Sequence, residues 1–103
     1  MDKTDKITIN EIKSTVGKLA EQYGAERIYL FGSYARGEAR PNSDVDLRID
    51  KGRIRGLFAL GGLRSDLEES LGLPVDLLPT DSLDDKFLNF IRDEEILLYG
   101  KEQ

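Results

Sequence analysis

Apolar and polar residues follow two periods along the chain, one typical of helices and one typical of strands. Over residues 9–23, apolar side chains recur every three or four positions, which predicts a helix with one buried face. Thr8 and Glu11 form a capping-box signature at its start, and Gly24 is a typical stop at its end. Residues 57–71 carry a leucine stripe at the same spacing and predict a second helix, despite an unfavourable pair of glycines within it.

Three short segments have the patterns of strands. Residues 27–31 end in an unbroken apolar run, which is typical of a strand buried on both faces. Residues 45–50 place apolar side chains at every second position, and residues 74–79 form a short apolar segment bounded by prolines. Because proline cannot donate to a sheet ladder, the prolines favour an edge position for this third strand.

The remaining segments are shorter. Residues 33–38 are predicted to form a short helix after the first strand, with Ser33 as its cap. Ser82 is predicted to cap a last helix, and residues 96–99 form a final apolar segment that is a strand or a helix end.

Helices and strands therefore alternate along the chain in the order α-β-α-β-α-β-α. This order predicts an α/β layer structure with a small mixed sheet and helices mainly on one face. The other face is expected to carry the site. The length of 103 residues predicts a single domain over residues 1–103.

A glycine turn and a pair of aspartates are the strongest candidates for chemistry. Gly32 and Ser33 follow the first strand, where the lack of a side chain allows a phosphate to approach the backbone. Asp44 and Asp46 point to the same side, because side chains alternate along a strand. Adjacent carboxylates repel each other unless a cation lies between them, and such oxygen ligands suit Mg²⁺. The alternative is an ordinary turn beside two solvated aspartates.

Asp76 is a third candidate carboxylate, placed between Val75 and Leu77 in the third strand. A charged group in such an apolar strand is costly unless it is paired or faces a site. The alternative is an aspartate on an edge strand that faces water.

Polar residues between the glycine turn and the aspartates are candidates for contact with a phosphate. Arg36 and Arg40 are either phosphate ligands, because arginine binds phosphate through two hydrogen bonds, or solvated charges. Ser43 is expected mainly to order the loop beside Asp44, and it is also a candidate nucleotide contact. Tyr34 is expected to lie near the nucleotide or to cover the short helix.

The composition limits the available chemistry. The chain has no cysteine and no histidine, which excludes disulfides, thiolate or histidine metal sites, and a histidine base. A net charge of −5 argues against direct binding of nucleic acid. The polar N-terminus and the lack of an apolar run of about 20 residues lead us to expect a cytoplasmic protein without a signal peptide or a membrane span.

The Gly32-Ser33 turn and the Asp44-x-Asp46 pair, at this spacing, resemble the nucleotidyltransferase fold of DNA polymerase beta. The short chain and its segment GSYARGEARPNSDVDL are most similar to the minimal nucleotidyltransferases (MNT). These are the antitoxins of HEPN/MNT toxin–antitoxin pairs. The resemblance extends over residues 7–100.

The resemblance implies a complete mechanism. In that family, the MNT chain transfers AMP from ATP to a tyrosine of a HEPN RNase toxin. By resemblance, Asp44, Asp46 and Asp76 bind Mg²⁺, with two ions expected, and Asp76 also accepts the proton of the attacking hydroxyl. Gly32 and Ser33 would hold the β- and γ-phosphates.

A chain of this length is expected to be used up by one core, so that another molecule must present the acceptor. The resemblance implies that this partner is a HEPN toxin. Two alternatives remain, a non-catalytic antitoxin that acts by binding and a small-molecule nucleotidyltransferase of the aminoglycoside type. The basic cluster of Lys51, Arg53 and Arg55 is either a solvated loop or a contact with a partner protein, RNA or the triphosphate.

Overall fold

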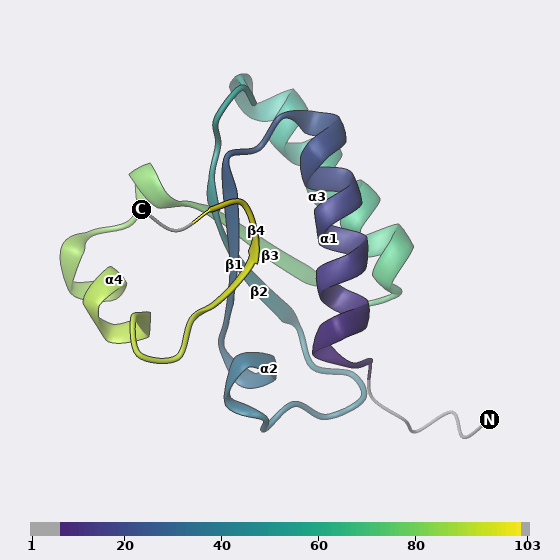
Figure 1. Ribbon diagram of the computed structural model, residues 1–103, viewed down its shortest axis with the longest axis vertical. Coiled ribbons are helices and arrows are strands. Elements are labelled where there is room, and N and C mark those ends of the chain that lie inside the picture. The colour runs from purple at the N-terminus through teal and green to yellow at the C-terminus, as the bar shows by residue number, and fades with distance from the viewer. Residues whose placement is uncertain (1–6, 102–103) are drawn as a thin grey trace.

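A four-stranded mixed sheet forms the centre of the computed structural model, which describes residues 7–101 (Figure 1). The polar segment 1–6 lies outside the described residues. The strands occur in the order β3-β2-β1-β4. β2 runs antiparallel to β1 and parallel to β3, and β4 runs antiparallel to β1. The strands are β1 (Arg27–Phe31), β2 (Val45–Asp50), β3 (Val75–Pro79) and β4 (Ile96–Tyr99).

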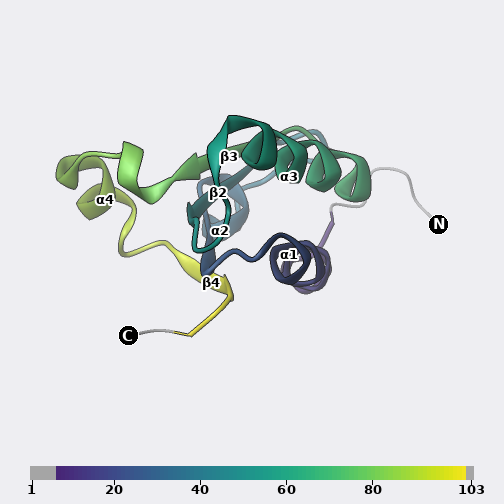
Figure 2. The same cartoon turned by 90° about the horizontal axis from the view of Figure 1, so that it is seen from above.

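Helices α1 (Ile9–Tyr23) and α3 (Gly56–Leu71) pack side by side on one face of the sheet. Figures 1 and 2 show α4 (Asp85–Ile91) on the opposite side of the sheet from these two helices. The predicted mixed sheet with helices mainly on one face is therefore confirmed. None of the helices within residues 7–101 has the length and apolar character needed to cross a membrane. The short elements are α2 (Ser33–Arg36) and the 3-10 helix η1 (Thr80–Ser82).

The hydrophobic core lies between the sheet and the helices α1 and α3. Ile28 and Leu30 point into it from β1 and are fully buried. The prediction that β1 is buried on both faces is wrong, because the long helices cover only one side. Tyr29 lies on the open face and is partly exposed, with the Arg48 guanidinium carbon 4.1 Å from the centre of its ring. The open face is therefore lined by polar and aromatic side chains.

Both ends of α1 confirm the start and stop signals predicted from the sequence. Thr8 Oγ1 accepts a hydrogen bond from the Glu11 backbone N–H at 3.1 Å, and Glu11 Oε1 accepts one from the Thr8 N–H at the same distance. Gly24 follows the helix in the left-handed conformation at φ 83°. The exact start and stop of this helix were therefore readable from local signals.

Two predicted caps are wrong. Gly32 is the N-cap of α2, and Ser33 is its first helical residue. Ser82 donates its hydroxyl to the Pro79 carbonyl within η1, whereas α4 is capped by Asp84, which accepts from the Phe87 N–H at 2.8 Å. At α4 the Asp84 carboxylate satisfies a free N–H group of the helix start, whereas Gly32 at α2 provides no side-chain cap. Ser82 bonds to the Pro79 carbonyl and does not cap α4.

The capping box predicts a measurable stability change. Thr8→Ala should lower the free energy of unfolding by about 1 kcal/mol, because a backbone N–H at the helix start loses its partner. Urea denaturation would measure this change. Ser14→Ala, at an exposed position inside the same helix, is the control and should cause no loss. Equal losses in the two variants would contradict the capping role.

Candidate active site

Gly32 forms a turn directly after β1, and a carboxylate lies against it. Its backbone has φ 79° and ψ −154°, a conformation that favours glycine. A Cβ atom placed at Gly32 would lie 2.1 Å from Asp46 Oδ2, which is far below any permitted contact. Glycine is therefore required here both by the backbone and by the nearness of the Asp46 carboxylate.

The pairing of the strands brings Asp46 and Asp76 together. In the parallel register of β2 and β3, Asp46 is directly opposite Asp76, so both project from the same face of the sheet. Val45 and Leu47 are fully buried on the other face, which directs Asp46 to the open side. Asp44 is exposed and stands one residue before β2. Asp46 and Asp76 therefore share one face of the sheet, whereas the predicted common side of Asp44 and Asp46 stays a prediction, because Asp44 lies before the strand.

The environment of Asp46 disfavours its charged form. Burial contributes most and, together with the charge of Asp76, a hydrogen bond with Asp76 that favours the protonated form of Asp46 and the charge of Asp44, raises the pKa of Asp46 from 3.8 to about 6. Arg36 acts in the opposite direction but does not cancel the shift. The site therefore carries an excess of negative charge, which a bound cation would relieve.

The donor set suits Mg²⁺ only in combination with a ligand. Within residues 7–101, no three acidic side chains converge closely enough to hold a metal ion by themselves. Mg²⁺ is commonly held by one or two carboxylates, with substrate phosphates and water completing its coordination. Asp46 and Asp76 fit that pattern in chemistry and position. The roles of Asp44, Asp46 and Asp76 as metal ligands remain predictions.

A carboxylate from the far end of the chain occupies the glycine turn. The Gly32 N–H donates to Glu94 Oε2 at 2.6 Å, and Glu94 Oε1 lies 3.2 Å from Arg36 Nη1. Arg36 also pairs with Glu38 at 2.9 Å, so it is not a simple solvated charge. Sequence reasoning missed Glu94. The only signal was an acidic run, residues 93–95, just before the last strand.

The structure also shows where the other residues predicted to lie near the nucleotide are found. Ser43 Oγ accepts from the Arg40 N–H at 2.7 Å, and Ser43 N–H donates to the Arg40 carbonyl at 2.9 Å, so Ser43 orders the loop as expected. Arg40 itself is exposed. Tyr34 is buried in the hydrophobic core, and burial raises the pKa of its hydroxyl. Tyr34 therefore anchors α2 to the core. Ser33 is partly buried beside Gly32, where its hydroxyl remains a candidate for phosphate contact.

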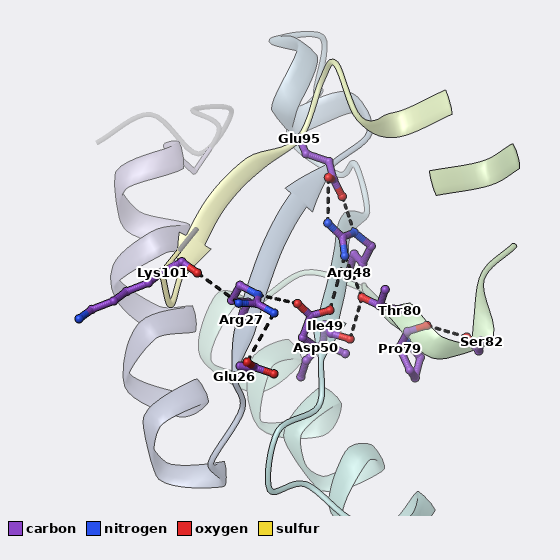
Figure 3. A network of polar contacts seen from close by, with 10 residues as sticks. All are labelled: Glu26, Arg27, Arg48, Ile49, Asp50, Pro79, Thr80, Ser82, Glu95 and Lys101. Atoms are coloured by element: carbon purple, nitrogen blue, oxygen red, sulfur yellow. Dashed lines mark hydrogen bonds and ion pairs between the residues drawn. The ribbon is translucent and has the colours of Figure 1, made fainter. Parts of the chain in front are cut away.

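Along the open face, two arginines neutralise carboxylates (Figure 3). Arg48 binds Glu95 through two hydrogen bonds of 2.5 and 2.9 Å. Arg27 Nε donates to Asp50 at 2.7 Å. Burial acts to raise the pKa of Asp50, but hydrogen bonds from Thr80 and Arg27 outweigh it and hold that pKa below its usual value. This balance of charge is the opposite of that at Asp46.

The basic cluster lies away from the glycine turn. Lys51 follows the end of β2, five residues beyond Asp46 and thus about 16 Å along the strand. The loop is anchored, because Ile54 is buried and the Arg53 N–H donates to the Gly24 carbonyl at 2.8 Å. This position does not support contact with the triphosphate. Contact with a partner protein or RNA remains a prediction.

Known proteins resemble nearly the whole chain. Residues 9–99 match the family model described as a nucleotidyltransferase domain. Protein adenylyltransferase MntA of Thermococcus cleftensis is 42% identical over 81 residues, which cover 75% of this chain and 82% of the relative. A Methanocaldococcus jannaschii protein, provisionally named a protein adenylyltransferase, is 39% identical over 87 residues, covering 81% and 94%. A chain of a toxin–antitoxin crystal structure with AMP-PNP superposes with a TM-score of 0.75 at 29% identity, covering 92% of this chain and 77% of that chain.

The raised pKa of Asp46 predicts a pH-dependent gain in stability for Asp46→Asn. Folding raises this pKa from 3.8 to about 6, so the carboxylate destabilises the metal-free fold above pH 6. The penalty shrinks as the pH falls from 6 towards 4, where Asp46 is protonated in the folded state and increasingly also in the unfolded state. Asp46→Asn should therefore raise the melting temperature most above pH 6. Melting curves in EDTA from pH 4 to 8 would measure this gain.

Glu69→Gln, which changes an exposed carboxylate on α3, is the matched control and should show no such window. A gain at Asp46→Asn that stays constant from pH 4 to 8 would contradict the assigned charge balance.

Proposed function

The chain belongs to the nucleotidyltransferase domain family, and we propose that it transfers AMP from ATP to a partner protein. The observation that carries this proposal is the Asp46 carboxylate, which lies against the Gly32 turn and opposite Asp76. It joins a turn suited to phosphate with carboxylates suited to a cation. The relatives named protein adenylyltransferases support AMP as the transferred group, and the AMP-PNP of the structural neighbour supports an adenine nucleotide.

The transfer is an in-line displacement at the α-phosphorus of ATP. An acceptor hydroxyl oxygen attacks the α-phosphorus and forms a new P–O bond, while the bond to the bridging oxygen of pyrophosphate breaks. Pyrophosphate leaves with the electron pair of that bond. Asp76, on the open face, accepts the proton of the hydroxyl. The Gly32 N–H, the Ser33 hydroxyl and Arg36 hold the departing phosphates, and Ser43 keeps the loop before Asp44 in place.

Asp44, Asp46 and Asp76 are the residues that would hold Mg²⁺, and two ions are proposed in line with the resemblance. When bound, Mg²⁺ would neutralise negative charge at the phosphate oxygens. The chain's own contribution is to fix the carboxylates by strand pairing. Since Asp46 and Asp76 are register partners in two hydrogen-bonded strands, their separation is set by the sheet and not by a loop.

We propose that the acceptor is a tyrosine of a HEPN RNase toxin, in the cytoplasm, and that the transfer silences it. The motif resemblance leads to this partner, and the toxin–antitoxin neighbour and the relative MntA support it. Direct binding of nucleic acid is not part of the proposal, in keeping with the net charge of −5. The three carboxylates favour catalysis over inhibition by binding alone, because binding alone would not need carboxylates at these three positions.

Intact-mass spectrometry of the partner toxin tests the proposed transfer. The chain is mixed with the HEPN protein, ATP and Mg²⁺, and the toxin should gain the mass of one or more AMP units. The double variant Asp44→Asn/Asp46→Asn should give no gain while it still binds the toxin, because the ligand charges are lost but the fold is kept. An inhibited RNase with no added mass would show that the chain is a binding-only antitoxin.

Asp76→Asn tests the role of Asp76 as general base separately from the binding of ATP. Losing a general base should reduce kcat by about 100-fold or more, whereas the affinity for ATP should change far less. The control is Asp81→Asn, which removes a carboxylate that pairs with Lys51 away from the site. Single-turnover assays with equilibrium binding measure both quantities. An unchanged kcat would exclude Asp76 as the base.

A further inference from the structure

Glu94 is a charged group at the glycine turn that the proposed reaction does not use. Its Oε2 accepts from the Gly32 N–H at 2.6 Å, and its Oε1 lies 3.2 Å from Arg36 Nη1. These are two of the groups that the proposed function assigns to the phosphates. A carboxylate thus occupies the position that a nucleotide phosphate needs.

We infer that Glu94 is an intramolecular competitor of the triphosphate, and that its carboxylate must leave Gly32 and Arg36 before the nucleotide binds productively. This inference rests on the proposed function, because it takes Gly32 and Arg36 as phosphate-binding groups. In the free protein, Glu94 satisfies the N–H of the buried Gly32 and the charge of Arg36. Glu94 therefore also holds the Gly32 turn and Arg36 in position.

The main chain around Glu94 is held in place. The backbone N–H groups of Glu94 and Glu95 both donate to the Ile91 carbonyl, at 3.0 and 3.1 Å. Ile91 is 1% exposed, and Glu95 is bound by Arg48, as Figure 3 shows. With the backbone fixed in this way, rotation of the Glu94 side chain is enough to clear the turn.

The charge of Glu94 makes it displaceable. The side chain brings one negative charge and is still 17% exposed, whereas a triphosphate brings several charges to the same donors. A polyphosphate can therefore outcompete the carboxylate, at a cost in affinity equal to the Glu94 contacts that it breaks. Once pyrophosphate leaves, Glu94 returns to the turn and hinders rebinding.

Binding of AMP-PNP and of pyrophosphate to the purified chain, measured by isothermal titration calorimetry, tests the inference. Glu94→Gln keeps the shape of the side chain but removes its charge, and it should bind both probes roughly fivefold to tenfold more tightly than the wild type. Asp93→Asn is the matched control. Asp93 is exposed on the same turn and has no ion pair within the part of the chain that the structure describes, so its variant should stay within roughly twofold of the wild type.

Glu94→Asp adds a second variant that keeps the charge but shortens the side chain, and it should also bind the probes more tightly. Circular dichroism checks the fold of each variant. Unchanged or weaker binding by both Glu94 variants, with a wild type that binds AMP-PNP, would overturn the competition and leave the proposed function standing. If no folded protein in the set binds AMP-PNP, the proposed function fails together with the inference.

Discussion

The antiparallel pairing of β1 with β2 is the constraint on which the site depends. It places the end of one strand beside the start of the next, so that Phe31 is the partner of Asp46 and the Gly32 turn follows at once. The parallel pairing with β3 then adds Asp76 opposite Asp46. A slip of one residue would turn Asp46 into the hydrophobic core and Leu47 towards the open face. Such a slip is strongly disfavoured, because it would remove the apolar side chains of β2 from the core. The same hydrophobic alternation that stabilises the sheet thus positions the chemistry.

Charge is distributed unevenly along the open face of this sheet. Arg27 and Arg48 pair with Asp50 and Glu95 and make these carboxylates part of the stable framework. Asp46, by contrast, faces further carboxylates and is destabilised in its charged form. Similar residue types on one face of the sheet are therefore charge-balanced in one place and uncompensated in another. Such uncompensated charge is typical of functional sites.

Local signals in the sequence were sufficient for most of the fold. The bounds of α1, β1 and β2 follow from periodicity and turn residues, and the positions of Gly32 and Asp46 follow from them, whereas Asp76 follows from the apolar segment that forms β3. The failures have physical causes. The caps at Ser33 and Ser82 had local competitors, and the burial of β1 depended on where the helices pack. Glu94 meets Gly32 across 62 positions of the chain, a contact that no short-range pattern records.

The fixed main chain beside Glu94 has a kinetic consequence. Many nucleotide-binding enzymes close a lid over microseconds to milliseconds, and that motion often limits turnover. Here the obstruction is the Glu94 side chain, and its main chain is anchored at Ile91 and Glu95, so clearing the turn takes a rotamer change and no lid movement. Entry of the nucleotide then needs no rearrangement of the backbone at this turn.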